Sequence, residues 1–350
     1  MFEKLKLILN MKTSGWQFLL MSVLVFLGVF GPRANGDETA ASVKSYLLKG
    51  LEKIKAASED FVANSEAYSK LVAANGGSVE AAYKADPKKI DKLIAKMQEN
   101  YKAMDSFGYE TIEGIVAGVP TLAEYDIYLD AGVPASEGPE DVAAVVLDLG
   151  NGQKIDKEGA LFTYIIEPML WAGDTRWVAP VDGGKKVLPR PEVLAAAAKD
   201  VNQKLGELLA DAKAWNASVA DCFGAMIVMT PTLSDYFEDW KESRYAKEKS
   251  GRFQAVSRVS DMRGIMGSCQ VMFEAVEGQV AEKDKSLAKS VDLGFKGVMS
   301  FLDTIEKREK QGEIKGAEID ELATQAKEKT DKLVPQIEQS AAVAGVKVES

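Results

Sequence analysis

Histidine is absent from this chain of 350 residues, and its absence excludes several kinds of functional site. A Ser-His-Asp or Cys-His catalytic centre, a histidine-ligated zinc ion and a histidine proton shuttle all need the imidazole ring. The sequence also has no glycine-rich phosphate loop, no Cys-x-x-Cys pair and no nucleophile elbow. Any chemistry must therefore come from carboxylates, phenols, amines, hydroxyls or thiols, and we expect a protein that is not an enzyme.

An excess of basic residues is also lacking. Lysine and arginine number 43 against 53 for aspartate and glutamate, which gives a net charge of −10 at pH 7. A nucleic-acid-binding protein needs a segregated basic face, and the sequence shows no such segregation. We therefore expect no nucleic-acid partner, and the negative charge favours cations as ligands.

Long hydrophobic runs are rare. One occurs at residues 16–30, with Lys6 and Lys12 before it and small residues up to Gly36 after it. This order of segments is typical of a secretory signal peptide, which we place at residues 1–36. The run has about 15 residues, whereas a membrane-spanning helix needs roughly 20. We expect a periplasmic or secreted protein with no stable membrane span after the signal peptide is removed.

Cysteine is nearly absent, since only Cys222 and Cys269 occur. In an oxidising compartment the two could form one disulfide and stabilise the fold by a few kcal/mol. Both also lie on apolar helical stretches, where buried thiols are expected. A disulfide requires the two Cα atoms to approach closely, and the sequence leaves both alternatives open, with buried thiols favoured.

The rest of the chain carries apolar residues at helical spacing nearly throughout. The spacing predicts a long first helix that ends at Asn75 and the two glycines after it, which form a stop signal. Asp86 and Pro87 are predicted to begin the next helix, because aspartate is a good N-cap and proline fits the first helical position. We therefore predict an all-α fold, a helix bundle, for residues 37–350.

Two stretches break the helical pattern. Residues 131–158 contain several glycines and prolines and the apolar run 142–149, which predicts a short β-hairpin inside a long insertion. Residues 173–191 form a second irregular insertion. Long insertions in compact helical domains usually carry function, so the helical segment between them, residues 160–171, is the first place to look for a site.

Sulfur-containing side chains offer one candidate site. Met262, Met266 and Cys269 recur at helical spacing, and thioether and thiol ligands suit copper(I). The same spacing is what a buried core stripe requires, and methionine commonly fills gaps in cores. Core packing is therefore the favoured interpretation, and copper binding would require these sulfurs to face a cavity.

Oxygen-containing side chains offer the other candidate. Tyr164 and Glu167 are three residues apart, so on a continuous helix they share a face and could bind one cation. Pro168 disfavours helical geometry at Glu167, and the alternative is a helix that begins at Pro168 and separates the two side chains. The segment from Glu167 to Asp174 resembles the E-x-x-L-W-G-x-D continuation of the G-x-H-x-x-E signature of the imelysin family. The histidine of that signature falls on Tyr164.

A second segment resembles the same family. The residues from Tyr109 to Glu113 (YETIE) are similar to the Tyr-Glu-x-Ile-Glu segment of EfeO-like members, and Glu110 and Glu113 share a helix face there. Asp126, before the first insertion, is a further candidate ligand. Each of these acids could also belong to a solvated helix face.

The resemblance implies paired helix bundles and an exported EfeO/EfeM-type protein that captures iron or another oxygen-preferring cation for uptake. It implies an inner-membrane iron permease or another uptake component as the partner. Tyrosine in place of histidine makes the site all-oxygen, which suits ferric iron or another divalent or trivalent cation. The peptidase label of the family is not expected to extend to a chain without histidine. The implied metal ligands are Glu110, Glu113, Asp126, Tyr164 and Glu167.

The alternative function belongs to a different class. A degenerate imelysin-like module that binds no metal would recognise a ligand or a protein in a cleft walled by the two irregular insertions. A metal site requires several of the named oxygens within a few Å of one point, whereas such a module leaves those side chains in solvent. The positions of the side chains therefore discriminate between the two functions.

Overall fold

The computed structural model describes residues 40–139, 141–150, 152–171, 175–246, 253–255 and 257–348. The chain divides into two units, Met1–Ala34 and Asn35–Ser350, and every described residue belongs to the second unit. The predicted signal peptide, residues 1–36, lies outside the described residues. Among the described helices, none has both the length and the apolar character needed to cross a membrane.

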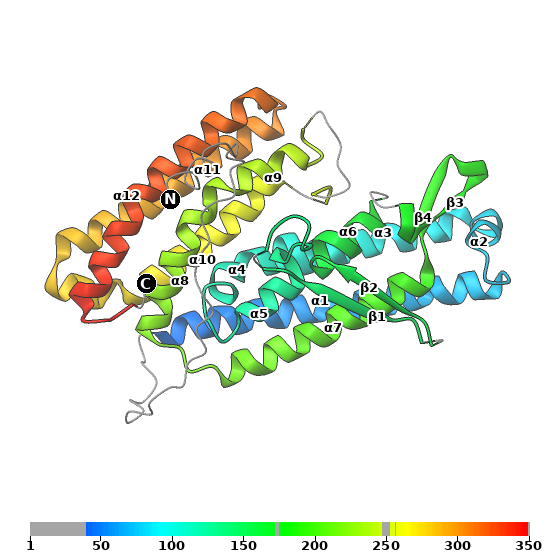
Figure 1. Cartoon of the computed structure of the whole chain (residues 1–350), viewed down its shortest axis with the longest axis horizontal. Coiled ribbons are helices and arrows are strands. Elements are labelled where there is room, and N and C mark those ends of the chain that lie inside the picture. Colours follow the sequence, from blue (N-terminus) through cyan, green and yellow to red (C-terminus); the bar gives the residue numbers. More distant parts are fainter. Residues whose placement is uncertain are drawn as a thin grey trace, which may run out of the picture. The chain divides into compact units, whose positions relative to one another are not determined.

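The described chain is predominantly helical, with two small antiparallel hairpins, which confirms the predicted fold class (Figure 1). The elements before the long central helix are α1 (Ala41–Ala74), α2 (Val79–Ala85), α3 (Pro87–Met104), α4 (Glu110–Val116), α5 (Ala123–Asp126), β1 (Ala144–Asp148), β2 (Lys154–Glu158), α6 (Glu167–Leu170), β3 (Val178–Val181) and β4 (Lys186–Pro189). The later elements are α7 (Pro191–Ala214), α8 (Val219–Met229), α9 (Tyr236–Glu242), α10 (Arg258–Lys283), α11 (Lys285–Lys310) and α12 (Ile319–Ala344).

A first group of helices packs around α1, which contacts both α3 and α7 (Figure 1). The contact forms because Val43, Leu47 and Leu51 recur on one face of α1 and are buried there. As predicted, α1 ends before Asn75. The side chain of Asp86 accepts a hydrogen bond from the N–H group of Lys89 at 3.0 Å, so it caps α3 as the sequence indicated.

A second group of helices packs around α10, which contacts α8 and α11, while α12 contacts α8, α9 and α11. The sulfur-containing stripe lies in this group. Met262, Met266 and Cys269 are fully buried within the hydrophobic core. Cys222 and Cys269 are both buried thiols, and burial raises the pKa of the Cys269 thiol to about 12. These sulfurs therefore pack the core, as the favoured interpretation expected.

Helix α4 packs against α10 and also contacts α1 and α8, and two glycines permit its close crossing with α10. A Cβ atom at Gly264 would lie 2.7 Å from the carbonyl oxygen of Glu110. A Cβ atom at Gly114 would collide with the hydroxyl of Ser268. Any larger residue would push the two backbones apart. The crossing therefore holds the first turn of α4, which carries Glu110, against the beginning of α10.

The two insertions each contain a hairpin. Strands β1 and β2 pair antiparallel, which confirms the hairpin predicted within residues 131–158. Residues 173–191 were expected to be irregular, but β3 and β4 also pair antiparallel there. Gly183 and Gly184 adopt positive φ angles of 65° and 87° in the turn, a conformation that glycine accepts without strain. Pro180 fits because both strands of a two-stranded sheet are edge strands.

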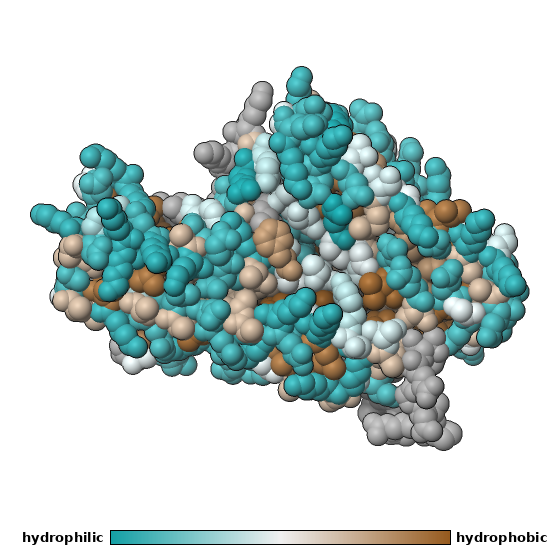
Figure 2. Space-filling view, turned by 180° about the vertical axis from the view of Figure 1, so that it is seen from behind, coloured by the Kyte–Doolittle hydropathy of each residue, from teal (hydrophilic) through white to brown (hydrophobic). Residues whose placement is uncertain are grey.

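The surface of the described chain is mostly hydrophilic on the face shown in Figure 2, where the hydrophobic areas are small and separate. Phe107 is 62% exposed and is the most exposed of the large hydrophobic side chains in the described ranges. Scattered hydrophobic residues of this kind are normal on protein surfaces. The unusual feature of this protein is instead a set of polar side chains in its interior.

Candidate metal centre

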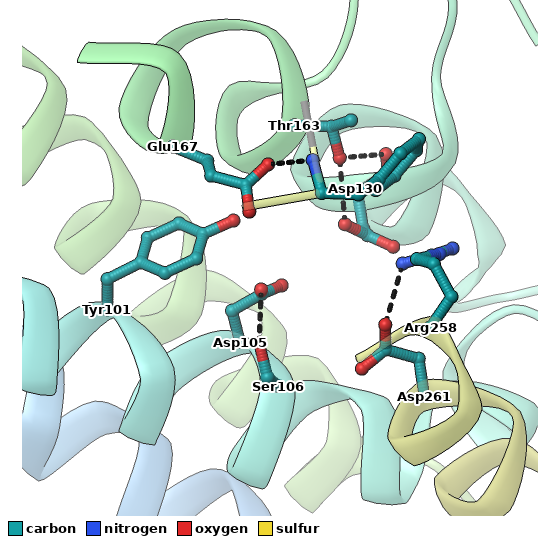
Figure 3. Close-up of a pocket in the computed structure, with 9 residues that line it drawn as sticks. Tyr101, Asp105, Ser106, Asp130, Thr163, Glu167, Arg258 and Asp261 are labelled. Atoms are coloured by element: carbon teal, nitrogen blue, oxygen red, sulfur yellow. Dashed lines mark hydrogen bonds and ion pairs between the residues drawn. The ribbon is translucent and has the colours of Figure 1, made fainter. Parts of the chain in front are cut away.

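Three short π-helical segments interrupt the helices near α3, α4, α5 and α6. They are Asp105–Tyr109 between α3 and α4, Ile127–Ala131 after α5, and Phe162–Ile166 before α6. A π-helical turn holds one residue more than an α-helical turn, so it changes the direction of the following side chains, and such turns are frequent at functional sites. All three segments contribute polar side chains to one cavity (Figure 3).

The cavity has a volume of about 10 Å³, which is enough for one water molecule or one ion and too small for an organic molecule. The π-helical segments line it with Asp105, Ser106, Asp130 and Thr163. The other lining residues are Tyr101, Glu167, Phe253, Arg258 and Asp261. The carboxylates of Asp105, Asp130 and Glu167 surround the same space in Figure 3.

Three carboxylates come closest together. Asp105, Glu110 and Asp130 each offer one oxygen, and these three oxygens lie within 4.8 Å of one another. The three residues are only 6%, 1% and 9% exposed, respectively. Oxygens bound to one hard cation lie about 2.0–2.6 Å from the ion. Two such oxygens can therefore be up to about twice that distance apart, and the spacing of these three oxygens falls within that limit. We call these three residues the acidic triad.

Four further buried carboxyl groups extend the acidic triad. All are at most 6% exposed, and electrostatic interactions connect them to the triad and to one another. Among the described residues, Arg258 is the only buried side chain that carries a positive charge. The acidic cluster, as we use the term, consists of Asp105, Glu110, Glu113, Asp126, Asp130, Glu167 and Asp261.

Burial raises the pKa of every carboxyl group in the acidic cluster. Loss of hydration is the largest cause in each case, because the charged form of a carboxyl group is the form that water stabilises most. Repulsion from neighbouring carboxylates raises the pKa of Asp105, Glu110 and Asp261 further. A bound cation would oppose both effects and hold these groups ionised.

Several oxygens of the acidic cluster have no hydrogen-bond partner among the described residues. Oδ1 of Asp105, Oε2 of Glu110 and Oδ1 of Asp261 are buried without a hydrogen bond. The other oxygen of Asp105 accepts a hydrogen bond from the hydroxyl of Ser106 at 3.0 Å. Buried polar atoms are nearly always paired, and an unpaired one costs about 1–3 kcal/mol. The unpaired oxygens are therefore positions at which a cation would be stabilised.

Glu167 lines the cavity and also anchors the segment that precedes α10. Its Oε2 atom accepts a hydrogen bond from the N–H group of Phe253 at 2.6 Å, and its Oε1 atom accepts from those of Gln254 and Ala255 at 2.8 Å each. Burial raises its pKa to about 7, although these backbone hydrogen bonds lower it in part. Glu167 has helical backbone angles, with φ −61° and ψ −52°, so a helix that begins only at Pro168 is wrong.

Glu110, Glu113 and Asp126 are buried in the acidic cluster but are not among the residues that line the cavity. Glu110 reaches the site through the acidic triad, whereas Glu113 and Asp126 pair with tyrosines. The hydroxyl of Tyr236 donates a hydrogen bond to Oε1 of Glu113 at 2.6 Å, and that of Tyr109 donates to Oδ1 of Asp126 at 2.9 Å. Neither acid belongs to a solvated helix face. The structure therefore brings together four of the five residues that the sequence nominated.

Tyr164 is the nominated residue that lies apart from the others. Its hydroxyl donates a hydrogen bond to Oε2 of Glu137 at 2.7 Å, and the Nζ atom of Lys157 lies 5.5 Å from the centre of its ring. The side chains of Tyr164 and Glu167 therefore do not share a face as expected. Tyr164 lies in a π-helical segment, where the spacing of an α-helix does not hold. The preceding residue, Thr163, lines the cavity instead and donates a hydrogen bond to Oδ1 of Asp130 at 3.1 Å.

Three acids of the cluster were missed from the sequence: Asp105, Asp130 and Asp261. A signal existed for two of them. Asp130 follows the nominated Asp126 by four residues, and Asp105 follows Tyr101, which is buried in α3, by four residues, so each lies about one helical turn beyond another residue of the site. For Asp261 the only local signal is its position three residues after Arg258, with which it forms an ion pair at 2.9 Å.

Comparison of this sequence with protein-family models and with curated proteins finds no match. The resemblance to the imelysin family therefore stays a prediction from the two short motifs. The last three residues of the first motif, 172–174, lie outside the described residues.

Proposed function

We propose that this chain is an exported, EfeO-like metal-binding protein that captures ferric iron or another oxygen-preferring cation for uptake. The observation that carries this proposal is the acidic cluster, in which seven buried carboxyl groups face a single buried arginine. Isolated buried charges are costly unless they are paired or coordinate a metal ion. A cation in the acidic triad would supply the missing positive charge.

The size and chemistry of the cavity favour an ion over a larger ligand. A volume of about 10 Å³ admits one ion and no sugar, peptide or nucleotide. This argues against an organic ligand in this cavity, whereas a metal-free recognition module that uses a cleft walled by the two insertions stays the alternative function. The donor atoms around the acidic triad are carboxylate and hydroxyl oxygens, which suit hard cations, whereas the methionine and cysteine sulfurs that would suit copper(I) pack in the core.

The cellular part of the proposal comes from the sequence. The predicted signal peptide and the resemblance to EfeO-like proteins favour a periplasmic or secreted location and delivery of the cation to an inner-membrane iron permease or another uptake component. Binding without chemical transformation fits a chain that has no histidine. The protein is thus proposed to be a binding protein and not an enzyme.

Measurement of metal content tests the proposal. The mature protein, purified without chelator, is analysed by mass spectrometry for bound metals and then titrated with ferric citrate, Mn²⁺ and Ca²⁺. We expect about one tightly bound cation per chain, because the acidic triad provides one set of oxygens. Asp105→Asn combined with Asp130→Asn should weaken binding at least about 100-fold, because two charged ligands are lost.

A matched control removes the same amount of charge from the surface. Asp60 and Asp331 are both exposed, so Asp60→Asn combined with Asp331→Asn should leave the affinity within about twofold. Circular dichroism would show that both double variants fold. A folded wild-type protein that binds none of the three cations would refute the proposed function.

A further inference from the structure

Arg258 begins α10 and points its guanidinium group into the acidic cluster (Figure 3). Its Nη1 atom lies 2.9 Å from Oδ2 of Asp261 and 3.7 Å from Oε1 of Glu110. The partner residue Glu110 also belongs to the acidic triad. Glu110 therefore interacts with the guanidinium group and also contributes an oxygen to the acidic triad.

Two aromatic rings and a further carboxylate also contact the guanidinium group. Its central carbon lies 4.7 Å from the centre of the Tyr236 ring and 4.4 Å from that of the Phe253 ring, which is within the range of cation–π interaction. Its Nη2 atom lies 3.4 Å from Oδ2 of Asp239. An arginine keeps its proton under all physiological conditions, so this positive charge is permanent and cannot leave the cluster.

The charges of the cluster leave room for more than one cation. When all seven buried carboxyl groups are ionised, their negative charge exceeds what one divalent or trivalent ion can neutralise. The carboxyl groups of Glu110 and Asp261 lie beside Nη1 of Arg258, and their other oxygens, Oε2 and Oδ1, have no hydrogen-bond partner in the described part of the chain. Paired metal sites typically hold ions about 3.5–4 Å apart with shared carboxylates, and Glu110 has the position of such a shared ligand.

We infer that Arg258 is a tethered counter-cation that occupies the position of a second metal ion and thereby limits the acidic cluster to one exchangeable cation. This inference rests on the proposed function and adds to it the number of ions bound. A protein that captures and releases one ion benefits from a fixed positive charge beside it, because like-charge repulsion weakens the hold on the exchangeable ion.

The test is the stoichiometry of Mn²⁺ binding. The mature wild-type protein and three variants are titrated with Mn²⁺, and the bound metal is measured by mass spectrometry after gel filtration. We expect about one ion per chain for the wild type and about two for Arg258→Gln, in which the neutral amide leaves Glu110 and Asp261 free to bind a second ion. Arg258→Lys keeps the charge and should remain at about one.

Arg263 provides the matched control, because it lies on the same helix but pairs with Asp303 and Glu306 at the surface. Arg263→Gln should bind about one ion, as the wild type does. A folded Arg258→Gln protein that binds one ion or none, beside a wild type that binds one, would overturn the inference and leave the proposed function intact. A wild type that binds no cation would overturn both.

A measurement on the wild type alone covers the case in which Arg258→Gln does not fold. Electron paramagnetic resonance of the Mn²⁺-saturated wild-type protein should give the six-line spectrum of isolated ions. Two Mn²⁺ ions about 3.5–4 Å apart would instead give a spin-coupled spectrum. A spin-coupled spectrum in the wild type would overturn the inference, because it would place a second ion beside an intact Arg258.

Discussion

The α1–α7 interface and the acidic cluster are both buried between helices, yet they treat their polar atoms differently. At the interface, Oδ1 of Asn202 accepts hydrogen bonds from Ser58 at 2.8 Å and from Lys55 at 2.7 Å. In the acidic cluster, four carboxylate oxygens have no hydrogen-bond partner within the ranges that the structure describes. A polar group that serves only the fold is normally paired. The difference is the one that the proposed metal site would explain, because a bound cation would pair the free oxygens of the acidic cluster.

The first prediction is that substitutions in the two regions change the free energy of unfolding in opposite directions. Asp105→Asn combined with Asp130→Asn should raise the free energy of unfolding of the metal-free protein at pH 7 by about 1–3 kcal/mol, because folding no longer has to desolvate or protonate two carboxyl groups whose pKa values burial raises. Ser58→Ala should lower it by about 1 kcal/mol, because Asn202 loses a hydrogen bond. Urea unfolding in the presence of a chelator measures both. A double variant that is destabilised like Ser58→Ala would mean that the cluster is structural.

The stability of the metal-free protein should fall as pH rises. The pKa of Glu167 is raised from 4.5 to about 7, so between these values the folded state binds more protons than the unfolded state. Stability then decreases with increasing pH, by about 3 kcal/mol across this window for Glu167 alone. The other carboxyl groups of the cluster are shifted in the same direction and add to the loss.

The same experiment with a cation sharpens this prediction. Urea unfolding is measured from pH 4.5 to above pH 7 with chelator and with saturating Mn²⁺. A bound cation favours the ionised carboxylates, so it should flatten the decline and release protons as it binds. Stability that rises with pH in the metal-free protein would contradict the assignment of raised pKa values to the cluster.

The crossing of α4 and α10 should tolerate no side chain at Gly264, although a side chain at Gly267 on the same helix should be tolerated. A Cβ atom at Gly264 would meet the backbone of α4 at the carbonyl group of Glu110, so Gly264→Ala should cost about 1–3 kcal/mol and weaken Mn²⁺ binding by displacing Glu110. At Gly267, on the same helix, a Cβ atom would have no neighbour within 4 Å. Gly267→Ala should stabilise the protein by up to about 1 kcal/mol, because alanine is the better helix former.

Thermal unfolding and Mn²⁺ titration of the two variants test this pair. If Gly264→Ala keeps both the stability and the affinity of the wild type, the close approach of the two helices does not position the triad. If Gly267→Ala is as destabilising as Gly264→Ala, the effect reflects the helix and not the crossing.

Much of the fold followed from local patterns in the sequence. The end of α1 at Asn75, the cap of α3 at Asp86 and the hairpin within residues 131–158 each depend on a few neighbouring residues. Their physical causes are local, namely capping hydrogen bonds and the conformational freedom of glycine. Such features can be read from a single sequence without knowledge of the tertiary structure.

The site was less accessible to this reasoning because its geometry depends on π-helical segments and on contacts between distant residues. Spacing rules assume 3.6 residues per turn, and the three π-helical segments break that spacing where the cavity forms. Glu110 and Glu113 lie in regular α4 and were identified. Asp105 and Asp130 lie within π-helical segments and were missed. Asp261 reaches the cluster only through the crossing of α10 with α4.

The smallest expected effect is a difference in Mn²⁺ affinity between variants of two adjacent residues in one π-helical segment. Thr163 donates a hydrogen bond to Oδ1 of Asp130 at 3.1 Å, so Thr163→Val should weaken Mn²⁺ binding by about tenfold, as the loss of an outer-shell partner usually does. Tyr164 donates to Glu137 instead, so Tyr164→Phe should change the affinity by less than about threefold. Isothermal titration of the two isosteric variants decides between them. The reverse order would mean that Tyr164 is a ligand in the metal-bound protein, as the spacing of the signature motif first indicated.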